Sequence, residues 1–95
     1  MAARRAERTE TDIQDWCCQY LARVLKRTPD QIDRQARFAS IGLDSAESLF
    51  LVSALEDWSG LELDSETAFD HPSVADLSRF VASRISAQHG TGSGT

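Results

Sequence analysis

Apolar and polar residues follow one another along the chain with the spacing of amphipathic helices. The first such pattern covers residues 11–26, where apolar residues recur every three or four positions: Ile13, Trp16, Cys17, Tyr20, Leu21, Val24 and Leu25. Thr11 is placed to cap this helix, and Pro29 prevents it from continuing. We expect the long connection that follows to be anchored on the folded body by Ile32, Phe38 and Ile41.

A second helix is predicted over residues 44–59. Asp44 and Glu47 have the spacing of a capping box, and Gly60 supplies the left-handed residue that commonly ends a helix. The buried side of this helix is expected to consist of Leu49, Val52, Leu55 and part of Trp58.

Two shorter signals complete the pattern. Residues 65–69 predict one short helical turn, closed by the sequence Asp-His-Pro, and a last helix begins at Ser73, with Asp76 as the acidic partner of the cap. This last helix should bury Val74, Leu77, Phe80, Val81 and Ile85. Three amphipathic helices and one short turn, without a strand pattern, predict an all-α protein, a small four-helix bundle.

The ends of the chain differ from its middle. Residues 1–10 are polar and unpatterned and predict a flexible leader, residues 11–86 form the folded domain, and residues 87–95 read as a flexible Gly/Ser/Thr tail. The sequence has neither an apolar run of the roughly 20 residues that span a bilayer nor a secretory signal. We therefore expect a cytoplasmic location. Whether the chain is a free-standing protein or a domain cut from a synthase stays open.

Length and charge exclude several classes of function. A chain of 95 residues has little room for a preorganised catalytic pocket, which favours a module on which other proteins act. The net charge of −5 argues against binding to nucleic acid or to an anionic membrane. Residues 38–78 contain nine acidic side chains and no Lys or Arg. This segment is either an ordinary solvated surface or a docking surface for basic partners.

The two cysteines, Cys17 and Cys18, are neighbours in the sequence. They cannot link distant segments and lack the paired spacing of a metal site, so we expect small buried hydrophobes and no metal.

Candidate chemistry centres on Ser45. If Asp44 is the cap, Ser45 is the first helical residue, and its side chain projects outward, where the active site of another enzyme can reach it. A phosphate ester on that oxygen would lie beside free backbone N–H groups and the positive end of the helix dipole. Gly42 would let the chain turn sharply into the helix, and Asp44 could help a partner hold a divalent metal.

The ordinary interpretation is that Ser45 only faces solvent at a helix start. A catalytic serine is not supported, because the sequence GLDSA does not fit the G-x-S-x-G nucleophile elbow and no strand precedes it. We predict no catalytic residue in this chain.

The sequence GLDSAESLFLVSALEDWSG, followed by FDHPSVADL, resembles an acyl carrier protein of the kind found in modular polyketide synthases. The resemblance implies that a phosphopantetheinyl transferase attaches 4′-phosphopantetheine from coenzyme A to Ser45, making the chain a phosphoprotein. The thiol of the arm would then hold acyl groups as thioesters, and the chain itself would be non-catalytic. It also implies that Gly42, Leu43 and Asp44 belong to the recognition motif around the serine.

The same resemblance implies that helix 44–59 docks the transferase, the acyl-loading enzyme and synthase domains such as a ketosynthase or an acyltransferase. Candidate docking residues are Ala46, Glu47, Phe50 and Asp57. Two of them depart from the family: Ala46 replaces a larger aliphatic residue, and Phe50 stands where an acid is frequent. Phe50 either docks into an apolar pocket with a basic rim or packs back near Phe38 or Ile41. We expect a monomer.

Two alternatives remain open. The first is a peptidyl carrier of nonribosomal peptide synthesis. The pair Leu43-Asp44 before the serine favours an acyl carrier over this alternative. The second is a helical interaction bundle without a prosthetic group. The sequence identifies neither the acyl group nor the pathway.

Overall fold

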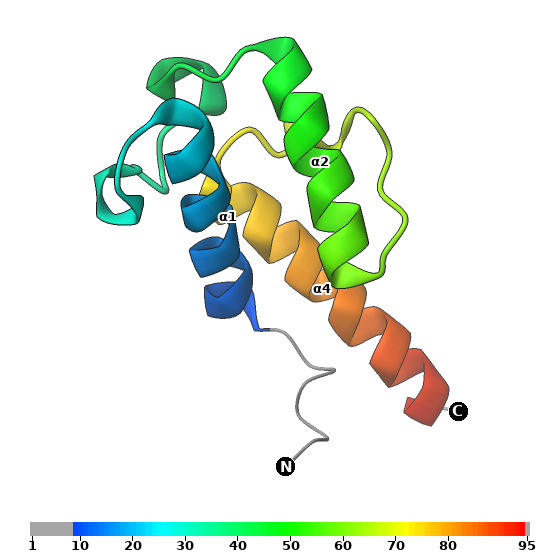
Figure 1. Cartoon of the computed structure of the whole chain (residues 1–95). Coiled ribbons are helices and arrows are strands. Elements are labelled where there is room, and N and C mark those ends of the chain that lie inside the picture. The colour runs from blue at the N-terminus through cyan, green and yellow to red at the C-terminus, as the bar shows by residue number, and fades with distance from the viewer. Residues whose placement is uncertain (1–8, 95) are drawn as a thin grey trace.

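The computed structural model describes residues 9–94, with side chains as far as Ala87. The elements follow in the order α1 (Glu10–Leu25), η2 (Pro29–Gln31), η3 (Phe38–Ile41), α2 (Ser45–Ser59), α3 (Thr67–Asp70) and α4 (Val74–Gly94). Figure 1 shows the three long helices packed together, with the short helices in the connections. Residues 9–94 contain no strand, only an isolated bridge between Arg37 and Ser73. The predicted all-α four-helix fold is confirmed.

The N-cap of helix α1 lies two residues earlier than predicted, at Thr9, and the helix begins at Glu10. The hydroxyl of Thr9 accepts from the Asp12 amide at 3.1 Å, and the Asp12 carboxylate accepts from the Thr9 amide at 3.1 Å. The prediction that Thr11 is the cap was therefore wrong, because Thr9 and Asp12 form a reciprocal pair that satisfies two amides at once. Residues 1–8 of the predicted leader lie outside the described residues.

Both ends of α2 agree with the sequence. Asp44 is the N-cap and pairs with Glu47 in a capping box. At the other end, Gly60 has a φ of +80°, and its N–H donates to the carbonyl of Glu56 at 2.9 Å. These local signals fix the length of the helix and the position of its first residue, Ser45.

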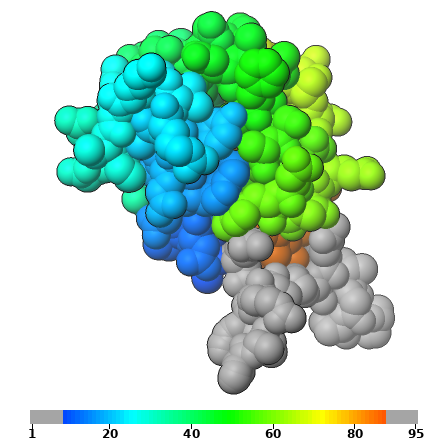
Figure 2. All heavy atoms as spheres, in the orientation of Figure 1, coloured from blue at the N-terminus to red at the C-terminus, as the bar shows by residue number. Residues whose placement is uncertain are grey.

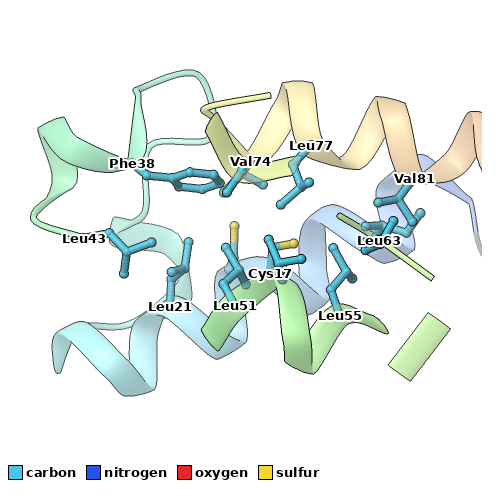
Figure 3. Packing of buried hydrophobic residues seen from close by; sticks show 14 of the residues in the cluster. Cys17, Leu21, Phe38, Leu43, Leu51, Leu55, Leu63, Val74, Leu77 and Val81 are labelled. Atoms are coloured by element: carbon cyan, nitrogen blue, oxygen red, sulfur yellow. The ribbon is translucent and has the colours of Figure 1, made fainter. Parts of the chain in front are cut away.

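The core lies where α1, α2 and α4 meet. In Figure 3, Leu51 and Leu55 of α2 point into the same cluster as Cys17 of α1 and Leu77 of α4. Leu51 is fully buried, whereas Leu49 is 40% exposed. The prediction that Leu49 lies on the buried side was wrong. The inward side of α2 instead consists of Ser48, Leu51, Val52 and Leu55.

The long connection between α1 and α2 is anchored as expected, since Ile32, Phe38 and Ile41 are all buried. The short turn forms as α3, which begins two residues later and ends one residue later than predicted. Trp16 stacks on Trp58 with the ring centroids 5.1 Å apart, which joins α1 to the end of α2.

Helix α4 is capped at Ser73, whose hydroxyl accepts from the Asp76 amide at 3.1 Å. Of the side chains predicted on its inward face, Val74, Leu77, Val81 and Ile85 are buried, and Phe80 is partly exposed. The helical backbone continues through Gly94, beyond the predicted domain end at residue 86. A flexible tail over residues 87–95 stays a prediction.

Both cysteines are free thiols buried in the core, as expected. Burial raises the pKa of the Cys17 thiol to about 12 and also raises the pKa of Cys18. Both groups are therefore protonated near neutral pH and act as small hydrophobes. Within the described part of the chain, no helix is both long and apolar enough to cross a membrane, and no cluster of His, Cys, Asp and Glu is arranged to hold a metal.

Candidate functional site

The site begins with the turn that leads the chain from η3 into α2. Gly42 has a φ of +98°, a left-handed conformation that L-residues adopt at a cost. A Cβ at this position would meet only the Leu25 side chain, at 4.0 Å. The backbone conformation, and not close packing, therefore accounts for the glycine.

Leu43 holds this turn against the core. Its N–H donates to the carbonyl of Phe38 at 3.0 Å, and its side chain is buried. The backbone on the N-terminal side of Ser45 is therefore fixed by one hydrogen bond and one apolar anchor.

Asp44 and Glu47 then set the start of α2. Asp44 Oδ1 accepts from the Glu47 amide at 2.8 Å, and Glu47 Oε1 accepts from the Asp44 amide at 3.1 Å. Ser45 is the first residue of the helix and is exposed. Its hydroxyl makes no hydrogen bond to another described residue, so it is free to react with an incoming group.

The geometry around Ser45 fits a phosphate ester. The capping box occupies the amides of Asp44 and Glu47, whereas the amides of Ser45 and Ala46 make no hydrogen bond within residues 9–94. Free N–H groups in the first turn and the positive end of the helix dipole both favour an anion at this position.

A pocket of about 200 Å³ opens beside Ser45, between the start of α2, the segment at η3 and the region of α3. The residues that line it are Arg37, Phe38, Ala39, Leu43, Asp44, Ser45, Ser48, Ala68, Phe69 and Pro72. Ser48 is buried there, and its hydroxyl donates to the carbonyl of Asp44 at 3.0 Å. The wall of the pocket is mainly apolar, and its polar part includes Ser45 and the charged side chains of Arg37 and Asp44.

The outer side of α2 is accessible to solvent. Figure 2 shows α2 (green) at the surface beside α1 (blue). Phe50 is 64% exposed, and Ala46 and Asp57 are also exposed, with Glu47 partly so. Phe50 therefore does not pack back into the buried cluster with Phe38 and Ile41.

Two solved structures that share this fold are carrier proteins. A free-standing peptidyl carrier protein from Acinetobacter baumannii superposes with a TM-score of 0.77 at 27% identity, covering 82% of this chain and 98% of that one. Asl1650, an acyl carrier protein from Anabaena with a variant phosphopantetheinylation-site sequence, gives a TM-score of 0.76 at 32% identity, covering 81% of this chain and 88% of that one.

The chain belongs to the family described as "phosphopantetheine attachment site", which it matches over residues 15–81. It is 34% identical over 76 residues to the acyl carrier protein TtuC of Teredinibacter turnerae, covering 80% of this chain and 87% of TtuC. It is also 41% identical over 59 residues to the non-reducing polyketide synthase VdtA of Byssochlamys spectabilis, which covers 62% of this chain but spans only 2% of that synthase.

This membership confirms the predicted class. The protein is a carrier of the acyl or peptidyl kind, of a typically non-catalytic family, and its cofactor is 4′-phosphopantetheine. Relatives of the polyketide synthase type imply synthase enzymes as partners.

Sequence reasoning missed three residues of the site. Ser48 occupies a position that the apolar pattern left unassigned. Arg37 and Phe69 reach the same pocket from segments that are distant in the sequence. The one signal in the sequence was that Arg37 is the last basic residue before the acidic segment 38–78.

Proposed function

We propose that Ser45 carries the 4′-phosphopantetheine arm and that the chain holds polyketide-type acyl intermediates as thioesters on the thiol of this arm. The observation that carries this proposal is the position of the Ser45 hydroxyl: exposed, without a hydrogen-bond partner among the described residues, and located at the first residue of a capped helix. The serine oxygen would form the new bond to phosphorus, and coenzyme A would release adenosine 3′,5′-bisphosphate. The attached arm supplies a thiol, which the chain itself lacks at its surface, because Cys17 and Cys18 are both buried.

The neighbouring residues support this role through position. Gly42 makes the turn, Leu43 anchors it, and Asp44 caps the helix so that Ser45 faces outward. Only one oxygen of the exposed Asp44 carboxylate is engaged in the cap, so Asp44 keeps the predicted ability to help a transferase place a divalent metal.

The outer side of α2 is the proposed docking surface for partners. Its candidate residues are Ala46, Glu47, Phe50 and Asp57, and the exposure of Phe50 supports its assignment to docking. The expected partners are a phosphopantetheinyl transferase, an acyl-loading enzyme, and a ketosynthase or an acyltransferase of the synthase. A monomeric state and a cytoplasmic location stay predictions.

A peptidyl carrier is the second candidate, favoured by the structural similarity to the peptidyl carrier protein of Acinetobacter baumannii. The identity to TtuC and to polyketide synthases supports the acyl carrier instead. The interaction bundle without a prosthetic group loses its support, because the chain belongs to a phosphopantetheine-attachment family.

The test is the intact mass of the protein after incubation with coenzyme A and a promiscuous transferase. The wild-type chain should gain one arm, and Ser45→Ala should gain none while keeping its helical circular dichroism. Ser53→Ala, which removes another exposed hydroxyl from the same helix, is the matched control and should still gain one arm. Modification of the Ser45→Ala protein would refute the assignment. Loading of the purified holo protein with acyl groups, and not with aminoacyl groups, by cognate enzymes would separate the two candidates.

A further inference from the structure

Arg37 is the one basic side chain among the residues that line the pocket beside Ser45. Its backbone is held by hydrogen bonds on the C-terminal side of its Cα. The carbonyl of Arg37 accepts from the amides of Ser40 and Ile41 at 2.9 and 3.3 Å, and the next amide, of Phe38, donates to the carbonyl of Pro72 at 2.7 Å. The point from which the guanidinium group extends is therefore fixed relative to the start of α2.

The side chain of Arg37 pairs with no carboxylate in the part of the chain that the structure describes. It is exposed and forms neither an ion pair nor a side-chain hydrogen bond there. By contrast, Arg34 binds Asp15 at 2.9 Å, and Arg79 binds Asp76 at 3.2 Å. Arg37 is thus available for an anion that arrives in the pocket.

The charges around Ser45 create a need for such a cation. A phosphodiester on Ser45 would add a negative charge next to the carboxylates of Asp44 and Glu47, which the capping box holds in place. Like charges this close repel one another, and residues 38–78 contain no Lys or Arg to offset them. Arg37 directly precedes this segment and lines the same pocket as Ser45.

We propose that Arg37 is a positioning residue that binds the phosphodiester of the arm attached to Ser45; this inference rests on the proposed attachment at Ser45. A guanidinium group presents a planar fork of N–H donors, which matches the two non-bridging oxygens of a phosphodiester. Together with the free amides of Ser45 and Ala46, this contact directs the first atoms of the arm toward the apolar wall of the pocket, which includes Phe69. The arm then leaves the helix in a preferred direction.

The test compares four holo proteins: wild type, Arg37→Gln, Arg37→Lys and the control Arg79→Gln. Arg79 is an exposed arginine of α4 that does not line the Ser45 pocket. All four are loaded from coenzyme A, and the added mass is verified. The ³¹P chemical shift of the arm is then followed from about 20 mM to about 1 M NaCl, a range over which the screening length falls to about 3 Å. In parallel, the side-chain Nε–Hε signals of Arg37 and Arg79 are compared between the apo and holo wild-type proteins.

In the wild type and in Arg79→Gln, the ³¹P chemical shift should change with salt concentration. In Arg37→Gln this salt-dependent change should fall to less than about half of the wild-type change, because the contact that salt screens is gone. Arg37→Lys, which keeps the charge, should retain most of it. The Arg37 Nε–Hε signal should move on loading, whereas that of Arg79 should not.

Two results would overturn the role of Arg37. One is an Arg37→Gln salt curve that superimposes on the wild type, and the other is an equal loss in Arg79→Gln. The failure of this inference is distinct from failure of the attachment itself. If no protein gains an arm, the proposal for Ser45 fails, and if the arm is added but its phosphorus signal ignores Arg37, only the present inference fails.

Discussion

Replacing Leu55 by alanine should destabilise the fold strongly and leave the site chemistry intact. Leu55 is fully buried in the cluster between α1, α2 and α4. Removing three carbons loses about 0.8 kcal/mol each, and the cavity left behind adds to this, so the free energy of unfolding should fall by about 2 to 5 kcal/mol. For a domain of this size, a loss of 2 kcal/mol lowers the melting temperature by at least about 8 °C.

Leu49→Ala is the matched control, because it removes the same three carbons from the same helix at a residue that is 40% exposed. Its cost should stay below about 1.5 kcal/mol, since less apolar area leaves water and no closed cavity forms. Urea denaturation followed by circular dichroism measures both variants, each in its apo and holo forms. Attachment of the arm at the exposed Ser45 should change the stability by no more than about 1 kcal/mol. The reasoning is refuted if Leu49→Ala costs as much as Leu55→Ala, or if the arm changes stability more than the Leu55 substitution does.

Two further predictions concern the surface and the thiols. Phe50→Glu should leave the melting temperature nearly unchanged, because Phe50 is 64% exposed, but should weaken binding of a cognate acyl-loading enzyme about thirtyfold or more. Calorimetric titration measures the affinity, with Ser53→Glu as the control for the added charge. A lower melting temperature with intact affinity would show that Phe50 contributes to stability instead. Burial raises the pKa of the Cys17 thiol from 9.0 to about 12, so the contribution of this thiol to stability is complete below pH 9 and is lost as the pH rises toward 12. The melting temperature should therefore fall over that pH range. Rapid labelling of Cys17 in the native protein at pH 8 would contradict its burial.

Local signals predicted the start of the site well. The capping box joins Asp44 to Glu47, and the left-handed Gly60 bonds back to Glu56. Each of these contacts spans only three or four residues, so the sequence is enough to define them. A similar local signal at the start of α1, the pair of Thr9 and Asp12, was present in the sequence but was overlooked in favour of Thr11.

The inward face of α2 was harder to predict, because Leu49, Phe50, Leu51 and Val52 are four successive apolar residues. In such a run the helical period does not determine which members face inward. The packing of α2 against α1 and α4 decides it, and that packing buries Leu51 and leaves Leu49 partly exposed. The choice depends on tertiary contacts that no local pattern contains.

The pocket beside Ser45 could not be read from the sequence for the same reason. Arg37 and Phe69 are 32 positions apart, and the backbone contacts of Arg37 and Phe38 with Ser73 and Pro72 bring the two segments together. A family resemblance predicts the attached group at Ser45 but does not say which side chains surround it here.

The central claim is that the arm is attached to Ser45, and mapping it to a peptide tests this claim most directly. Trypsin alone would leave residues 38–79 as one fragment, because no Lys or Arg lies between Arg37 and Arg79. Adding a Glu-specific protease, which cuts after Glu47, releases fragment 38–47, whose only serines are Ser40 and Ser45. Tandem mass spectrometry of this fragment from the holo protein should place the phosphopantetheine on Ser45. An arm on Ser40, or an unmodified fragment 38–47 from a protein whose intact mass includes the arm, would contradict the account.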